Sequence, residues 1–173
     1  MATSAQLLAD GFGRIRENVA GVLDGLTPEQ LAYRVDPGAN PVSWLVWHLT
    51  RVQDDHLAAA FGVPQVWSAA GWATRFGLPA GMMDHGYGHS AERVATVAAA
   101  TASAGLLTEY HEQTYTQTIK LVSELIDDDL DRVVDTRWTP HVTLGVRLVS
   151  VLDDDMQHVG QAAYVRGVLL RRV

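Results

Sequence analysis

Two histidines and a run of three aspartates are the residues of this chain whose types and spacing best suit chemistry. Asp154 and His158 lie four residues apart in a segment with helical periodicity, so their side chains fall one turn apart on one face. Carboxylate oxygen and imidazole nitrogen both bind divalent ions such as Zn²⁺. His48, from a second helical segment, would complete a His–Asp–His set. Such a set leaves a position for water or substrate, as catalytic zinc sites do.

The same residues allow two other interpretations. Asp155 lies three residues before His158 and is a rival ligand to Asp154. It is also placed to accept a hydrogen bond from a ligating imidazole. Without a metal, a buried histidine beside an aspartate is a satisfied polar pair of the core. The spacing alone therefore leaves a metal site and a structural pair open.

Four segments with a period of 3.6 residues must position these side chains. They predict helices over residues 4–26, 41–62, 103–126 and 142–167, with Thr143 as the N-cap of the last. Residues 63–89 lack a period and are rich in glycine and aromatic residues, which predicts a long crossover that folds over something. A short helix is expected over 91–100, and no run predicts a strand. The expected fold is an all-α four-helix bundle, one domain over residues 1–173.

Polar side chains interrupt the inner faces of three of these helices part-way along their length. In a bundle such residues can meet in one pocket. The predicted pocket residues besides the ligands are Trp44, Arg51, Asp55, Tyr110, Arg147, Asp155 and Gln161.

The remaining histidines and aspartates receive plainer predictions. Angles on the helical wheel place Asp54 and Asp153 in solvent, and His111 and His141 are assigned to the surface or to connectors. His56 falls near the core stripe and is predicted to be a hydrogen-bonded core residue rather than a ligand. His85 and His89 belong to the glycine-rich segment; they are expected to be polar loop residues, which could approach an open metal position.

Composition excludes several classes of function. A net charge of −7 supplies no positive stripe for nucleic acid, so binding of nucleic acid is not expected. The chain has no cysteine, which excludes disulfides, thiolate ligands and cysteine nucleophiles. No segment approaches the roughly 18 uninterrupted apolar residues of a membrane span. Without cysteines or a signal-peptide pattern, a cytoplasmic location is expected.

Two segments resemble the DinB-like superfamily of metal-binding four-helix proteins, which includes mycothiol- and bacillithiol-dependent enzymes. They are WLVWHLTRVQDDH (residues 44–56) and DDDMQHVGQAAYVRG (residues 153–167). The resemblance covers nearly the whole chain and implies an up-down-down-up bundle, often a homodimer. Members usually carry three histidine ligands, and His48 and His158 match two of them. The third position falls on Asp154, which implies a more anionic, harder ligand set.

The resemblance implies a metal-dependent enzyme that uses a low-molecular-weight thiol such as mycothiol as a transferase, or else a hydrolase. Zinc is the expected metal, with nickel, iron and manganese as alternatives, and the substrate is a small molecule. Arg51 or Arg147 would bind an anionic group, and Asp55 or Asp155 would orient a ligand imidazole. Trp67 and Tyr87 would line a lid. The alternative is a non-enzymatic bundle, metal-stabilised or metal-free, that binds a small molecule or a partner.

Overall fold

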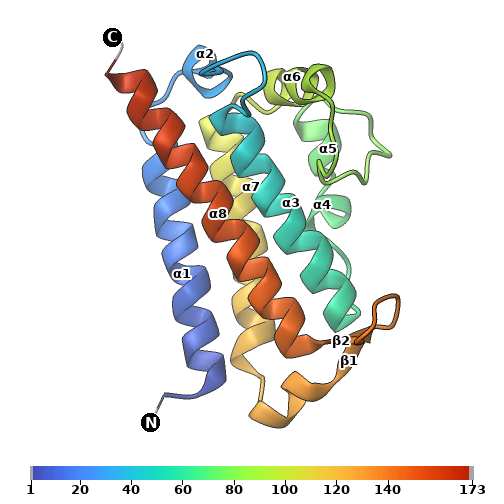
Figure 1. Ribbon diagram of the computed structural model, residues 1–173. Helices are drawn as coiled ribbons and strands as arrows, with labels where there is room; N and C mark the ends of the chain where they lie inside the picture. The colour runs from blue at the N-terminus through green and yellow to red at the C-terminus, as the bar shows by residue number, and fades with distance from the viewer. Residues whose placement is uncertain (1, 172–173) are drawn as a thin grey trace.

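Four long helices form the body of the protein in the computed structural model, which describes residues 2–171 (Figure 1). They are α1 (Ser4–Leu23), α3 (Val42–Phe61), α7 (Ala104–Ser123) and α8 (Leu144–Leu170). In Figure 1 the chain runs up α1, down α3, down α7 and up α8. The predicted all-α, up-down-down-up bundle is therefore confirmed.

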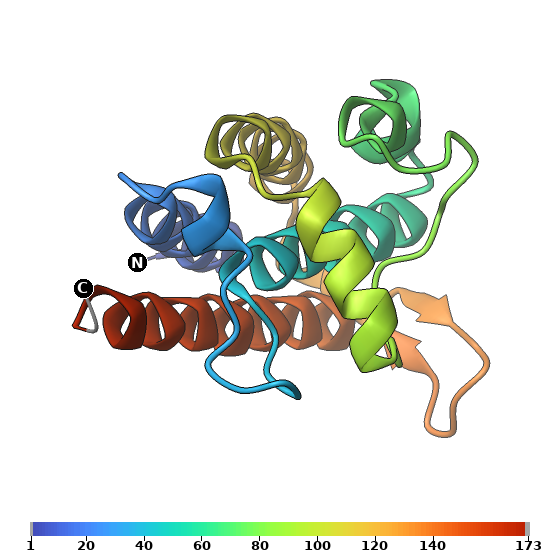
Figure 2. The ribbon, with the colours of Figure 1, turned by 90° about the horizontal axis from the view of Figure 1, so that it is seen from above.

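The connections are mostly short elements at the ends and on one side of the bundle. After α1 the chain forms α2 (Pro28–Leu31), and after α3 it forms α4 (Val66–Ala69), α5 (Trp72–Arg75) and α6 (Ala91–Ala100). Seen from above, α6 lies across the end of the bundle near α3 (Figure 2). After α7 come a 3₁₀ turn, η1 (Asp127–Asp131), and a hairpin of β1 (Val133–Asp135) and β2 (Val142–Thr143).

Local signals in the sequence account for the ends of these helices. The Thr143 hydroxyl accepts a hydrogen bond from the amide of Val146 and caps α8 as predicted. Thr27 caps α2 in a capping box with Gln30. Gly62 ends α3 at φ +67°, a left-handed conformation that favours glycine.

The structure corrects several predictions made from periodicity. The hairpin was not predicted because its strands are too short to show an alternating pattern. Asp54 and His111 are buried, with only 2% and 1% of their surfaces exposed, so the prediction that they face solvent was wrong. A helical wheel gives the angle of a side chain but not which faces are covered. Here α4 packs on α3 and α7, and the crossover covers α3 on a side that the wheel left to solvent.

No helix within residues 2–171 combines the length and hydropathy that a membrane crossing requires. The core instead fills the space between the four long helices. It is built from apolar side chains of each, among them Phe12, Ile15, Leu45, Leu49, Leu107, Leu148 and Val151.

His111 is a neutral histidine within this core. Its Nδ1 lies 3.1 Å from the Thr50 hydroxyl, which itself donates to the carbonyl of Val46, so Nδ1–H is the donor to Thr50. Burial, with a smaller effect of Arg16, lowers the pKa of His111 to about 4. The unfolded chain therefore takes up this proton at a higher pH than the native protein does.

We expect the free energy of unfolding to fall as the pH decreases from about 6.5 to about 4, because protons bind the unfolded chain more tightly in this range. One histidine shifted this far contributes about 3 kcal/mol to the loss. In His111→Asn, which retains an amide donor to Thr50, that contribution should disappear. Urea unfolding at several pH values measures it; an unchanged pH slope in the variant would contradict the assignment.

Candidate metal centre

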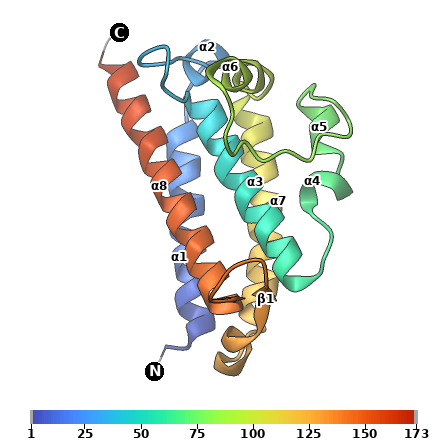
Figure 3. The same ribbon diagram turned by 45° about the vertical axis from the view of Figure 1, so that its right-hand side comes forward.

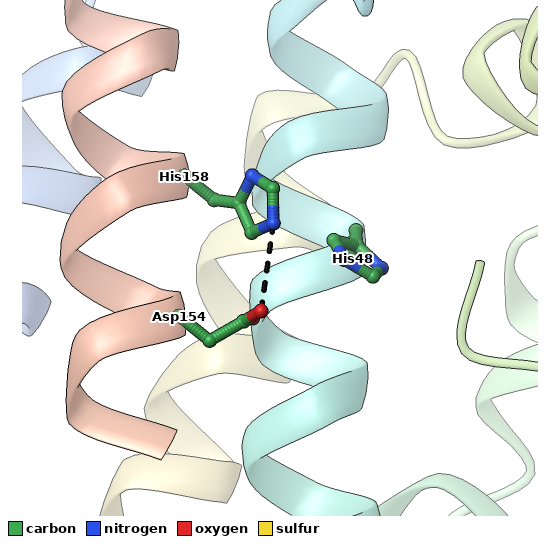
Figure 4. Close-up of side chains that lie close together, drawn as sticks. All are labelled: His48, Asp154 and His158. Carbon is green, nitrogen blue, oxygen red and sulfur yellow. Dashed lines mark ion pairs between the residues drawn. The ribbon is translucent and has the colours of Figure 1, made fainter. Parts of the chain in front are cut away.

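The three predicted ligands come together between α3 and α8 (Figure 4). His48 projects from α3, and Asp154 and His158 project from successive turns of α8. One donor atom from each of the three lies within 4.8 Å of the other two. The Nε2 of His158 is 3.6 Å from Oδ1 of Asp154. The 3.6 Å separation fits two ligands of one ion, because ligands about 2 Å from a metal lie about 3–4 Å apart, and the third donor lies close enough to join them.

The hydrogen bonds of both imidazoles leave a nitrogen free for an ion. Nδ1 of His158 lies 2.9 Å from the side-chain oxygen of Gln161, and Nδ1 of His48 lies 2.5 Å from the main-chain carbonyl of His85. Both partners are acceptors, so each Nδ1 carries a proton, and in the neutral form of each ring the free lone pair is on Nε2. The indole of Trp44 stacks on the His48 ring at a centroid distance of 4.6 Å and restricts its rotation.

Charge and burial at the site also suit a cation. Burial lowers the pKa of His48 to about 4, so this imidazole is neutral at neutral pH and its lone pair is available. Burial raises the pKa of the Asp154 carboxyl, and the neighbouring His158 reduces this increase. Oδ2 of Asp154 is buried and has no hydrogen-bond partner within residues 2–171. A cation would compensate that unpaired oxygen, so the donor set fits a metal ion.

The site opens on a cavity of about 240 Å³. Its lining includes two of the ligands and residues of α3, α8 and the crossover: His48, Val52, His56, His85, Tyr87, Arg147, Ser150, Val151 and Asp154. A second cavity, of about 440 Å³, shares three of these residues and continues toward the hairpin. A groove of about 680 Å³ between α1 and α8 contains none of the three ligands. Space for a small molecule therefore adjoins the ligand cluster.

Arg147 is the predicted anion-binding residue that reaches these cavities. Its guanidinium donates to Oδ2 of Asp135 at 3.0 Å and to Nδ1 of His56 at 3.2 Å. Hydrogen bonds from Arg137, with a further contribution from the charge of Arg147, hold the pKa of Asp135 far below its usual value. Burial and the charge of Arg147 lower the pKa of His56. His56 is thus a hydrogen-bonded, half-buried residue rather than a member of the ligand cluster.

Arg51 and Tyr110 do not line either cavity. The Arg51 side chain is fully buried, 3.5 Å from the Asp54 carboxylate and 3.3 Å from the Tyr110 hydroxyl. Tyr110 lies among aromatic side chains that include Trp67 and Trp72, and its hydroxyl donates to Asp54. The structure therefore places Arg51 in a buried ion pair instead of at a substrate-binding surface.

Asp55 and Asp155, predicted to accept a hydrogen bond from a ligand imidazole, make no contact with His48 or His158 among the hydrogen bonds of residues 2–171. Asp155 is fully buried and neither of its oxygens has a hydrogen-bond partner within residues 2–171; burial holds its pKa well above the usual value. Asp55 accepts a hydrogen bond from Gln65 and lines the 440 Å³ cavity. The imidazole acceptors are instead Gln161 and the carbonyl of His85. Gln161 was predicted as a pocket residue but not as an acceptor, and no sequence pattern identifies a main-chain carbonyl in an aperiodic segment.

The two predicted lid aromatics have different positions. Tyr87 is exposed and lines the 240 Å³ cavity. Trp67 is buried, and its indole nitrogen donates to the carbonyl of Met82 at 2.6 Å. Of the two, Tyr87 is therefore the side chain that borders the open side of the site.

Comparison with known proteins identifies relatives of this fold and sequence. The family model described as Mycothiol-S-transferase matches residues 7–170. The solved structure of a conserved protein from Enterococcus faecalis is similar, with a TM-score of 0.88 and 30% sequence identity. That match covers 98% of this chain and 99% of the other. No curated protein matches the chain. From the family match over residues 7–170, the chain belongs to the mycothiol-S-transferase family, a member of the DinB-like superfamily.

Proposed function

We propose that this protein is a metal-dependent transferase that joins a low-molecular-weight thiol of the mycothiol type to a small electrophile. The family points to the thiol. The observation that carries the metal dependence is the convergence of His48, Asp154 and His158 beside a cavity, with one oxygen of Asp154 buried and unpaired. A bound divalent ion would lower the pKa of a coordinated thiol or water and supply a nucleophile near neutral pH.

The protein's own residues would hold and orient the reactants. His48 and His158 would offer nitrogen donors, and Asp154 would offer an oxygen in place of the third histidine usual for the superfamily. Zinc is the expected ion, and the carboxylate also favours harder ions such as iron or manganese, with nickel a further alternative. Arg147, Ser150 and Tyr87 line the cavity and are placed to contact the electrophile or the thiol.

The cavity favours an enzyme over a metal-stabilised binding bundle. A purely structural site is closed by four protein ligands, whereas three ligands facing a cavity leave a position for thiol or water. Hydrolysis would use the same site with water as the nucleophile. Homodimer formation, a cytoplasmic location and the absence of nucleic-acid binding stay predictions of the sequence.

Metal content tests the ligand set directly. We expect protein purified without chelator to hold a stoichiometric divalent metal, measured by elemental analysis. Asp154→Ala should weaken binding by more than the roughly 10–100-fold that loss of a residue supporting a ligand costs. Asp154→His should retain binding, because imidazole replaces carboxylate as a donor.

The matched control is Asp153→Ala, which removes a neighbouring carboxylate that is exposed and hydrogen-bonded to Gln157. This variant should keep its metal and the metal-dependent rise in melting temperature. Equal metal affinity in the Asp154→Ala and Asp153→Ala variants would show that Asp154 is not a ligand.

Activity separates the transferase, the hydrolase and the binding bundle. With the metal loaded and a panel of small electrophiles, we expect consumption of mycothiol and formation of its S-conjugate. His158→Ala should lower the rate on the order of 10²–10³-fold, as loss of metal activation worth several kcal/mol implies. Mass spectrometry of products identifies the reaction. Turnover without thiol would indicate a hydrolase, and binding without turnover by either route would support the non-enzymatic alternative.

A further inference from the structure

Residues 82–86 of the crossover, which we call the strap, pass directly over the His48 side chain. In Figure 3 the segment after α5 runs back across α3 before it reaches α6. The carbonyl of His85 accepts the Nδ1–H of His48, and Gly86 follows immediately. The strap therefore contacts the imidazole at Nδ1, and His158 lies next to the same ring at a centroid distance of 4.6 Å.

Gly86 permits this contact for two reasons. Its φ of +100° is in the region that favours glycine. A Cβ atom at this position would lie 2.9 Å from Nδ1 of His48, 2.9 Å from Trp44 and 3.0 Å from Trp47. Both indoles are buried, with 5% and 0% of their surfaces exposed, so they have little room to move away. Any larger residue at position 86 must therefore displace the strap or the imidazole.

Four consecutive carbonyls of the strap receive side-chain donors from buried or half-buried groups. The carbonyl of Met82 accepts from Trp67 Nε1 at 2.6 Å. Those of Met83 and Asp84 accept from the Arg51 guanidinium at 2.9 and 3.3 Å. The next carbonyl, of His85, accepts from His48. With the three preceding carbonyls held in place, the fourth is directed at the imidazole.

Arg51, which donates to two carbonyls of the strap, is held in place by Asp54. The Asp54 carboxylate forms a fully buried ion pair with Arg51. It also accepts the main-chain amides of Val66 and Trp67, at 2.8 and 2.7 Å, at the start of α4. A single carboxylate thus links Arg51 to the beginning of the crossover, and Arg51 links it to the strap.

The carboxylate of Asp84 fixes the other end of the strap. It accepts the amide of Gly86 at 2.7 Å and lies 2.6 Å from Nε2 of His89. His89 in turn accepts from the indole of Trp44, the ring that stacks on His48. The ring and the strap are therefore held by one connected set of contacts.

We propose that the strap is a positioning element for His48, in which the His85 carbonyl keeps the proton on Nδ1 and Gly86 allows the close approach that directs Nε2 toward Asp154 and His158. Its role in metal binding rests on the proposed function, but the state of the imidazole does not. Gly86 and His85 act through His48, so they are positioning residues rather than catalytic ones.

The tautomer of His48 in metal-free protein tests whether the His85 carbonyl keeps the proton on Nδ1. Long-range ¹H–¹⁵N spectra at neutral pH, assigned with His48→Gln, should show a protonated Nδ1 and an unprotonated Nε2. A protonated Nε2, or a rapidly averaging ring, would overturn the proposal. If the expected tautomer is found but no metal binds, the inference about the imidazole stands and the proposed function fails.

Two glycine variants test the steric part. Gly86 and Gly88 both have left-handed backbones, at φ +100° and +74°, but a Cβ at Gly88 meets no heavy atom within 4 Å. Alanine therefore strains both backbones and creates a clash with His48 only at position 86. Gly86→Ala should alter the His48 tautomer signals and weaken metal binding roughly 10–100-fold, whereas Gly88→Ala should keep both.

Equal tautomer signals and equal metal affinity in the two variants would overturn the role of Gly86. Circular dichroism and melting temperature establish that both variants are folded. If Gly86→Ala does not fold, the tautomer measured in the unmodified protein decides the role of the His85 carbonyl, and Gly86→Ser compared with Gly88→Ser decides the role of Gly86.

Discussion

The buried ion pair between Arg51 and Asp54 is the interaction on which the arrangement of the site depends. Both side chains are fully buried, and every polar contact they make reaches the crossover or Tyr110. Removing one partner of such a pair costs about 3–5 kcal/mol, because the other charge is left buried and uncompensated. The pair therefore commits the crossover to one path across α3, and this path brings the carbonyl of His85 to His48.

The candidate metal centre combines one local and one long-range constraint. The i, i+4 spacing on α8 places Asp154 and His158 on one face whatever the rest of the chain does. His48 reaches them because α3 and α8, which run in opposite directions (Figure 1), pack against each other. Burial then keeps His48 neutral, and its partner at Nδ1 leaves the free lone pair on Nε2. Geometry and protonation thus support the same use of the imidazole.

In the proposed centre, Asp154 takes the position of the third histidine that the resemblance to the superfamily implies. Replacing a neutral imidazole by a carboxylate adds negative charge next to two neutral nitrogens. That change strengthens attraction for harder divalent ions and lowers the net charge of the loaded site. Because Asp154 also borders the cavity, its carboxylate would add negative charge next to the thiol or electrophile of the proposed reaction.

Periodicity in the sequence determined the bundle and its four long helices, and spacing together with the family resemblance predicted His48, Asp154 and His158 as candidate ligands. Amphipathic helices and i, i+4 pairs are local properties, so they can be recognised without knowing what packs against them. The burial of Asp54, His111 and Asp155 was decided only by the tertiary structure, because it depends on which faces neighbouring elements cover. The tertiary structure also decided which group accepts the hydrogen bond from His48. Every residue has a main-chain carbonyl, so the sequence cannot single one out, and only the path of residues 82–86 brings the carbonyl of His85 to the imidazole.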